Sequence, residues 1–470
     1  MKTKRIITLF LISFITINLL MYLAYETVSL IEIYRNSEST MEVAFGTLIL
    51  FIVLLVIYYI AYRSEKKYCM ERRNEINQLI KICEKEIKED IVDLGIFTGY
   101  PGLALYYFEK HKLFNDNDAF KKFEHYLDKS LNGLQEDKVF SLCSGSVGIY
   151  YLIFYLTKNK YFDDPIEESF EEFPEYADEL LEYYAGKRNF DYLHGFMGVL
   201  FLCLELYSFS TDQDFKHQIK ERSITVVYLL KSLSVPVDED KIAWISKGLY
   251  SKVEGFSFGF AHGIPSIISL LSNVYTAGIE KETIKEMLDK SYRFIRSVQG
   301  DYDGSSFPNF ITVRDGERIA TDSSRLAWCY GDLSVGIAML HYGKALGNQE
   351  SISEAEKILV KTTEREYGKT GVVDVFLCHG SSGLIMMYHY LYRVTGNEAF
   401  KKATDFWTHD TLAIGNHPET GMRTWLGSEG WIEQDTILEG RTGLLLQLYA
   451  ITHENYKNPL EKLFLLDHEH

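Results

Sequence analysis

Cysteine, proline and positive charge are all scarce in this chain of 470 residues. The 6 Cys are too sparse for a disulfide scaffold and fit reduced thiols, as in the cytosol. Only 49 Lys and Arg stand against 66 Asp and Glu, giving a net charge of −17. Binding of nucleic acid needs a basic face, so we expect no nucleic-acid partner. With 8 Pro, no low-complexity tract and 46% hydrophobic residues, the chain can build a large core.

Charge is also absent from two long apolar runs near the N-terminus, residues 6–25 and 43–62. Each has the length of about twenty residues that a helix needs to cross a bilayer. Basic residues precede the first run and follow the second, so the positive-inside rule places both ends of the pair in the cytoplasm. We therefore expect a membrane anchor, a two-helix transmembrane hairpin in residues 1–64. Residues 65–470 would then form a cytoplasmic domain of a multi-pass protein of the cell membrane.

From about residue 70 the sequence repeats a short glycine turn followed by ten to fifteen mostly apolar residues. The first glycine of each turn can provide a backbone angle forbidden to other residues, and the second lets the next helix start close to its neighbour. Serine replaces the second glycine in two copies. The seven turns are Gly99-Tyr-Pro-Gly102, Gly145-Ser-Val-Gly148, Gly195-Phe-Met-Gly198, Gly263-Ile-Pro-Ser266, Gly331-Asp-Leu-Ser334, Gly380-Ser-Ser-Gly383 and Gly440-Arg-Thr-Gly443.

The runs after these turns are apolar nearly all round, which predicts helices buried on every side. Amphipathic stretches lie between them and predict outer helices with one wet face. An outer helix from the start of the domain can close against the inner helix from its end. The sequence thus predicts an all-α fold, an α/α toroid of seven inner and seven outer helices with all the glycine turns at one mouth. The outer stretches are 70–90, 117–134, 173–187, 213–234, 280–299, 351–365 and 398–413.

Two intervals of the repeat are long, and the second of them contains a β-prone segment, residues 310–320. Two short runs of this kind flank Asp315-Gly316, a pair typical of tight turns. We expect a β-hairpin there.

Two runs 49 residues apart carry soft metal ligands directly before a glycine, Ala327-Trp328-Cys329-Tyr330-Gly331 and Leu377-Cys378-His379-Gly380. Together they offer two thiolates and one imidazole. Structural zinc is closed by four protein ligands, whereas three ligands leave a position for a substrate atom. The same residues could also be core residues that never meet, because free Cys is often buried.

The repeat favours the first interpretation, since residues just before each first glycine would converge at one mouth of the ring. Polar residues next to buried helices need partners, so a shared polar site explains them better than coincidence. Asp191 lies four residues before Gly195 and joins this set. The residues directly before the glycines are Thr98, Ser144, His194, His262, Tyr330, His379 and Glu439.

Such a site suits the activation of a thiol. Zinc bound by two thiolates and an imidazole would lower the pKa of a substrate thiol. If the thiolate adds to an activated alkene, the enolate that forms needs a proton, and His262 is the suitable general acid. Asp191 could orient or tune His262, and Arg325 could stabilise the charge of the enolate. For Asp191 and Arg325 a structural ion pair is an equally good interpretation.

At these residues the sequence resembles the lanthionine synthetase C-like family, the lanthipeptide cyclases, over about residues 90–453. The resemblance implies one zinc ion held by Cys329, Cys378 and His379, and functional roles for Asp191 and His262. It also implies Michael-type addition of Cys thiols to dehydroalanine or dehydrobutyrine in a dehydrated precursor peptide. A separate dehydratase and an exporter are the partners expected. The residues that carry the resemblance are Trp328-Cys329-Tyr330-Gly331, Cys378-His379-Gly380, Ala261-His262-Gly263, Arg325 and Asp191.

Two features depart from the family pattern, namely His194 beside Gly195 and the predicted hairpin in the membrane. Other functions also remain open at this point. A non-cyclising relative that binds zinc and glutathione or another thiol would have the same ligands. A glycoside hydrolase ring would use paired carboxylates such as Asp191 and Glu439, and a zinc prenyltransferase-like ring would need a basic site for a diphosphate. A membrane-anchored helical scaffold without catalysis is the last alternative.

Overall fold

The computed structural model describes residues 40–467, apart from residues 90, 92, 135–138, 248–252 and 315–316. The chain divides into two units between Asn74 and Glu75. In the first unit the structure describes the N-terminal part of helix α2 (Thr40–Glu86). The second unit contains the last turns of α2 and every later element. The predicted domain boundary between residues 64 and 65 stays a prediction.

The predicted transmembrane hairpin and multi-pass membrane location are not borne out. Among the residues described, no helix is both long enough and apolar enough to cross a bilayer. The first predicted span, residues 6–25, lies outside the described residues.

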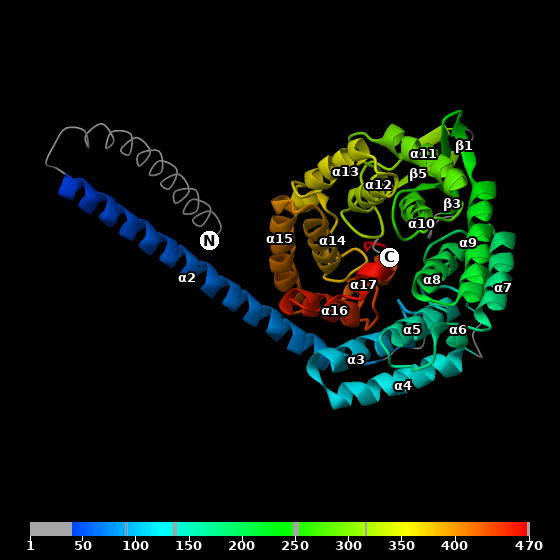
Figure 1. Cartoon of the computed structure of the whole chain (residues 1–470), viewed down its shortest axis with the longest axis horizontal. Helices are drawn as coiled ribbons and strands as arrows, with labels where there is room; N and C mark the ends of the chain where they lie inside the picture. The colour runs from blue at the N-terminus through cyan, green and yellow to red at the C-terminus, as the bar shows by residue number, and fades with distance from the viewer. Residues whose placement is uncertain are drawn as a thin grey trace. The chain divides into compact units, whose positions relative to one another are not determined.

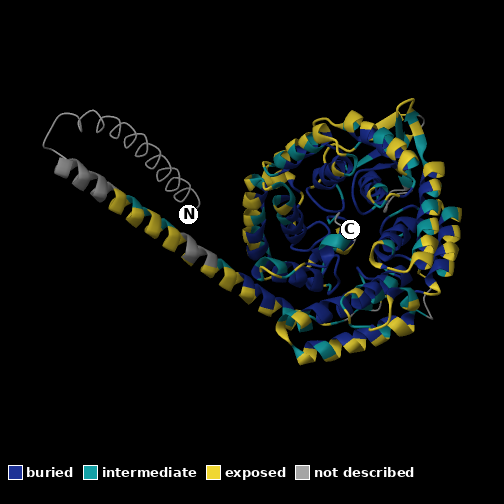
Figure 2. Ribbon diagram, in the orientation of Figure 1, coloured by how far each residue is buried: buried dark blue, intermediate teal, exposed yellow. Residues whose placement is uncertain are grey.

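A ring of inner helices forms the centre of the second unit, as the apolar runs predict (Figure 1). Each inner helix begins directly after the first glycine of a turn, and buried residues cover nearly its whole circumference (Figure 2). The prediction of a helical toroid is confirmed. Within the described residues the inner helices are α3 (Tyr100–Phe114), α5 (Ser146–Lys158), α8 (Phe196–Phe209), α10 (Ile264–Thr276), α12 (Asp332–Leu346), α14 (Ser381–Thr395) and α16 (Arg441–Thr452).

The outer helices surround this ring and expose their polar faces to solvent (Figure 2). Several begin with a side-chain cap, as where the Asp116 carboxylate accepts hydrogen bonds from the N–H groups of Asp118 and Ala119. The last turns of α2 supply the first outer helix, with Ile76, Leu79 and Cys83 buried on one face. The others are α4 (Asn117–Gly133), α7 (Phe173–Gly186), α9 (Gln213–Leu233), α11 (Lys281–Val298), α13 (Gln349–Thr362) and α15 (Glu398–Gly415).

The glycines of the turns are required by close backbone approach more than by a forbidden angle. Only Gly331 of the seven first glycines has a positive φ, 101°. The others are extended, yet a Cβ at Gly145 would lie 1.9 Å from the carbonyl oxygen of Val139. Each turn therefore folds back tightly on the segment that leads into it, and a larger residue would push that segment away.

Short strands occupy the two long intervals of the repeat, before Gly263 and before Gly331. The predicted hairpin is confirmed, because β5 (Phe310–Arg314) and β6 (Glu317–Ala320) pair antiparallel. They extend a four-stranded sheet of order β3-β4-β5-β6, whose β3 (Ser246–Lys247) and β4 (Glu254–Ser257) the sequence did not indicate. Strand β4 leads directly to the turn at Gly263. The remaining elements are β1 (Val235–Asp238), β2 (Lys241–Ala243), β7 (Thr424–Trp425), β8 (Trp431–Ile432), α6 (Ile166–Ser169), α17 (Leu460–Leu463) and two single 3-10 turns, η1 (Tyr367–Lys369) and η2 (Gly427–Glu429).

The two ends of the ring are joined by a buried cation. Helix α16 packs against α3, and Arg441 at the start of α16 is only 1% exposed. Its guanidinium lies 3.2 Å from Asp435 Oδ1 and 3.0 Å from Glu433 Oε2, and it donates to the backbone carbonyl of Glu86 at the end of α2. One side chain thus ties the first outer helix to the last inner helix.

We expect Arg441→Ala to destabilise the fold by about 3–5 kcal/mol, because the buried carboxylate of Asp435 would lose the cation that neutralises it. Urea unfolding of the purified chain measures this. Arg423→Ala is the matched control, since Arg423 contacts the same Glu433 at 3.4 Å but is 46% exposed. The control should cost no more than about 1 kcal/mol. Equal losses in the two variants would contradict the role of Arg441 in closing the ring.

Candidate active site

The three residues before each first glycine occupy three levels of the ring. The residue three positions before each first glycine is fully buried. The residue directly before it is partly exposed, except for His379, which is buried. The polar side chains predicted to converge therefore do lie at the mouth. The seven buried residues beneath them are Ile96, Leu142, Tyr192, Phe260, Trp328, Leu377 and Ile437.

Backbone hydrogen bonds join six of the seven turns at the middle level, two residues before the glycine. We call the seven residues at this level the backbone belt: Phe97, Cys143, Leu193, Ala261, Cys329, Cys378 and Leu438. It explains how Cys329 and Cys378 come together, because both are members of it and are linked directly. Buried N–H groups in these irregular segments find their partners in the next turn. The bonds run from Cys143 N to Leu193 O (2.9 Å), Phe97 N to Cys143 O (3.2 Å), Leu438 N to Phe97 O (3.1 Å), Cys378 N to Leu438 O (3.0 Å) and Cys329 N to Cys378 O (3.3 Å).

The structure brings Cys329, Cys378 and His379 into one buried group, with a potential ligand atom from each within 4.8 Å of the others. The thiol of Cys378 donates a hydrogen bond that lowers the pKa of Cys329, and His379 lowers it further. Burial lowers the pKa of His379, but hydrogen bonds to Asp374 and Cys329 outweigh it and raise that pKa to about 10. A thiolate is therefore favoured at Cys329, as a metal ligand must be.

Asp374 is a further carboxylate beside this group that sequence reasoning missed. Its fully buried carboxylate lies 3.2 Å from His379 Nε2 and accepts hydrogen bonds from the N–H groups of Phe376 and Trp425 and the hydroxyl of Thr424. With Nε2 engaged, Nδ1 is the ring nitrogen left for a metal. Carboxylates commonly orient metal-binding histidines in this way. The signal was an Asp six residues before Gly380, which a sequence alone does not distinguish from a capping residue.

These residues fit zinc. Two thiolate sulfurs and one imidazole nitrogen form the donor set that zinc prefers, and three protein donors leave one position open. Glu439 lies beside the group, with Oε1 3.7 Å from His379 Nδ1. Burial raises the pKa of Glu439 above its usual range.

His262 and Asp191 form a pair on the same mouth. His262 Nδ1 lies 2.6 Å from Asp191 Oδ2, and the other carboxylate oxygen accepts the backbone N–H of His194 at 2.8 Å. Burial lowers the pKa of His262, but the Asp191 charge outweighs it and raises the pKa above its ordinary value. The ring of Tyr330, next to Cys329, lies 6.2 Å from that of His262.

The imidazole of His194 stacks on that of His262, with centroids 5.9 Å apart and an interplanar angle of 10°. Burial lowers the pKa of His194, while Asp191 opposes this. His194 is thus neutral more often than His262 and shares the same carboxylate through its backbone.

Arg325 is exposed and four residues from Cys329. Its positive charge lowers the pKa of Cys329 and opposes the rise at Cys378. The structure therefore places Arg325 within electrostatic reach of the two thiols, on the loop that leads to them.

A helical ring that gathers two thiols and an imidazole at its mouth defines an α/α toroid with a candidate zinc-thiolate site. The family described as Lanthionine synthetase C-like protein matches residues 90–465 of the chain. This protein belongs to that family, as the motifs predicted.

Individual relatives are more distant. Nisin biosynthesis protein NisC of Lactococcus lactis subsp. lactis is 24% identical over 343 residues, which cover 66% of this chain and 77% of that protein. Glutathione S-transferase LANCL1 of Danio rerio is 22% identical over 370 residues, covering 76% and 86% respectively. The solved structure of nisin cyclase aligns with a TM-score of 0.64 at 20% identity, over 84% of this chain and 97% of that one. That likeness shows the shared fold.

Purified protein should contain about one zinc per chain, and Cys329→Ala and Cys378→Ala should each lose it, because two protein donors hold zinc poorly. Elemental analysis after gel filtration gives the stoichiometry. Cys143→Ala is the matched control, since this buried cysteine occupies the same position in the belt at another turn. Retention of zinc in both ligand variants, or its loss in the control, would contradict the assignment.

Asp374→Asn should weaken zinc binding about 10–100-fold, because His379 would lose the carboxylate that orients it. Competition with a chromophoric chelator measures the affinity. Thr424→Val removes a donor to Asp374 but leaves the Asp374 carboxylate beside His379, so it should retain near wild-type affinity. An unchanged affinity in Asp374→Asn would show that Asp374 serves the fold alone.

Proposed function

We propose that this protein is a zinc-dependent lanthipeptide cyclase. It joins Cys thiols of a dehydrated precursor peptide to dehydroalanine or dehydrobutyrine and so forms thioether rings. The observation that carries the proposal is the meeting of Cys329, Cys378 and His379 on the mouth that also holds the His262–Asp191 pair. Family membership and the similarity to a nisin biosynthesis protein and to nisin cyclase support it.

Cys329, Cys378 and His379 would hold the metal ion, with Asp374 fixing the imidazole. When bound, zinc supplies Lewis acidity that lowers the pKa of a substrate thiol at its open position. Because the three donors are buried, water has little access to them, and charges act more strongly there than in bulk solvent.

His262 supplies the proton that completes the addition. The substrate sulfur forms a bond to the β-carbon of the dehydro residue, and the π electron pair moves toward the carbonyl as an enolate. His262 then donates its proton to the α-carbon. The substrate thiol has released one proton to solvent, and His262 takes one up from solvent, so no proton is gained or lost overall. Asp191 favours the charged form of His262 by its proximity, at 2.6 Å. Arg325, whose charge reaches the thiols, is assigned to stabilise the developing enolate.

The substrate is a precursor peptide already dehydrated by a separate enzyme. A dehydratase and an exporter are the partners that we propose for this reaction, as the family resemblance implies. The anionic chain, with a net charge of −17, favours a basic or neutral peptide over an acidic one.

A dehydrated peptide with one free Cys tests the function directly. Addition is an isomerisation and leaves the mass unchanged, so ring formation is followed by the loss of thiols that N-ethylmaleimide can alkylate. We expect zinc-dependent loss of the free thiol, abolished in Cys378→Ala. Added glutathione provides the discriminating arm, because one relative is named a glutathione S-transferase. Transfer of glutathione to the peptide without ring formation would show that the protein catalyses intermolecular thiol addition and not cyclisation.

The pH dependence of the reaction identifies the proton donor. His262 acts in its protonated form, so the rate should fall as pH rises through its pKa. Asp191 raises that pKa, and Asp191→Asn should therefore move the decline to lower pH. His262→Gln should reduce kcat by about 10²–10⁴-fold. The profile of kcat/KM against pH measures both, and an unchanged alkaline limb in Asp191→Asn would exclude His262 as the titrating acid.

A further inference from the structure

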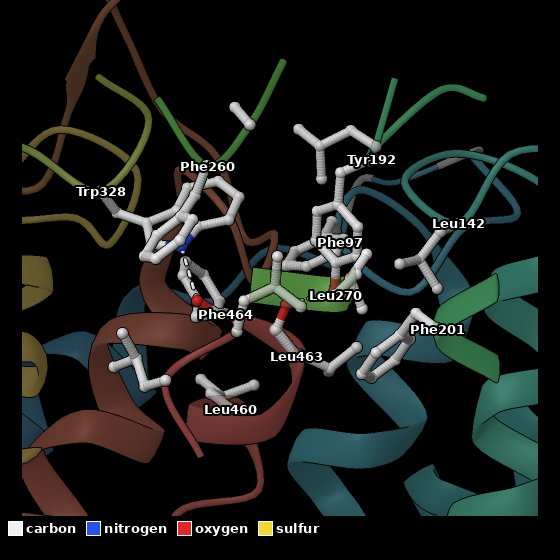
Figure 3. Packing of buried hydrophobic residues seen from close by; sticks show 14 of the residues in the cluster. Phe97, Leu142, Tyr192, Phe201, Phe260, Leu270, Trp328, Leu460, Leu463 and Phe464 are labelled. Atoms are coloured by element: carbon white, nitrogen blue, oxygen red, sulfur yellow. Dashed lines mark hydrogen bonds between the residues drawn. The ribbon is translucent and has the colours of Figure 1, made fainter. Parts of the chain in front are cut away.

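The last described residues of the chain fill the centre of the ring beneath the active site. Residues 459–467, which include α17, form what we call the C-terminal plug (Figure 1). Its apolar side chains are almost completely buried, from Leu460 and Leu463 to Phe464 and Leu466, each 0% exposed. Figure 3 shows Leu460, Leu463 and Phe464 pointing into the cluster below the turns.

The plug packs against the lowest level of the turns. The ring of Phe464 lies 4.6 Å from that of Trp328 and 5.4 Å from that of Phe97. Its sides are held by ion pairs, since Glu461 pairs with Arg393 of α14 and Lys462 lies 3.3 Å from Glu205 of α8. The plug therefore bridges opposite parts of the ring.

Two of the seven residues at this level also donate hydrogen bonds to the backbone of the plug. Trp328 Nε1 donates to the carbonyl of Phe464 at 2.8 Å, and the hydroxyl of Tyr192 donates to the carbonyl of Leu463 at 2.7 Å. Both donors are fully buried. The other five residues at this level are hydrocarbon side chains, Ile96, Leu142, Phe260, Leu377 and Ile437.

The location of these two donors is informative. Trp328 directly precedes Cys329, and Tyr192 directly follows Asp191. A segment that only filled the ring would need apolar contacts alone, and a buried donor is costly when its partner is imperfect. Two of the plug's polar contacts fall instead on the loop of a candidate metal ligand and on the loop of the proton-donor pair. They connect these loops through two consecutive carbonyl groups of one short segment.

We propose that the C-terminal plug is a positioning element of the active site. By holding Tyr192 and Trp328, it fixes the separation between the Asp191–His262 pair and Cys329. The inference rests on the proposed cyclase function, because it assigns the plug to the alignment of the thiol-activating and proton-donating groups.

Tyr192→Phe removes one buried hydrogen bond to the plug with little change of shape. Trp328→Phe removes the other, and it also costs packing because the indole is replaced by a smaller ring. Tyr388→Phe is the matched control, because Tyr388 is equally buried on an inner helix and its hydroxyl bonds Thr362 Oγ1 at 2.9 Å, away from the plug. Phe464→Leu alters the plug itself and removes its ring contact with Trp328. The full-length protein is used throughout, with cobalt(II) as a spectroscopic probe of the metal site.

Trp328→Phe should weaken metal binding about tenfold and shift the sulfur-to-cobalt charge-transfer bands, because Cys329 moves. Tyr192→Phe should leave these bands unchanged but lower kcat about tenfold at constant KM, because the proton donor is misplaced. Phe464→Leu should show both effects. Tyr388→Phe should match the wild type in spectrum and kcat, although it should lose about as much thermal stability as Tyr192→Phe.

Loss of stability alone in all four variants would overturn the inference and leave the plug as filling for the ring. The same holds if the Tyr388→Phe control changes the spectrum as much as Trp328→Phe. A variant that does not fold is identified by its thermal melt, and Phe464→Leu then carries the test. Failure of the proposed function is distinct, because it would appear as a wild-type protein that binds no metal or forms no rings.

Discussion

The backbone belt is the interaction on which the rest of the ring depends. Each inner helix begins at a glycine turn, and the irregular segment before that turn has buried N–H and C=O groups that no helix satisfies. They pair with the next turn instead, as where Cys329 donates to the carbonyl of Cys378 and Cys378 donates to that of Leu438. Leu438 then donates to Phe97, so the last turn is linked to the first. A closed ring allows this pairing to pass from the last turn back to the first, and buried backbone groups need it.

The belt also explains why the polar side chains of the turns lie at one mouth of the ring. A residue that follows a member of the belt points to the open side, where His262 and Glu439 are partly exposed. A residue that precedes a member points into the core, where Phe260 and Trp328 have no exposed surface. The repeat therefore presents one polar side chain per turn above a hydrophobic layer. Substitutions above the belt can change chemistry without disturbing the packing below it.

Electrostatics then divides the mouth into two functional parts. On one side, Asp374 and the neighbouring thiols favour a charged His379 and a thiolate at Cys329. On the other side, Asp191 favours a charged His262. Both arrangements follow from carboxylates held close to imidazoles in a poorly solvated place, where their attraction outweighs the cost of burial. Tyr330 stands between the two parts, with its ring next to that of His262.

Much of this architecture could be read from local patterns. The seven glycine turns, the apolar inner helices and the hairpin of β5 and β6 depend on neighbouring residues, whose spacing is visible in the sequence. The convergence of the residues before each glycine followed from the repeat itself. The positive backbone angle predicted for the first glycines was wrong for all but Gly331. A glycine is also required where two extended segments approach too closely for a Cβ, and the sequence looks the same in both cases. The membrane hairpin was also not borne out, since no helix among the described residues is both long enough and apolar enough to cross a bilayer.

The sequence by itself determined the repeat, the ring and the residues that face its mouth, because each rests on short-range sterics and periodic burial. Tertiary structure alone decided that Asp374 lies beside His379 and that the C-terminal plug fills the ring. Tyr192 bonds a carbonyl 271 residues away, and Trp328 bonds one 136 residues away. No local pattern carries such contacts, because they exist only when the ring has closed around the plug.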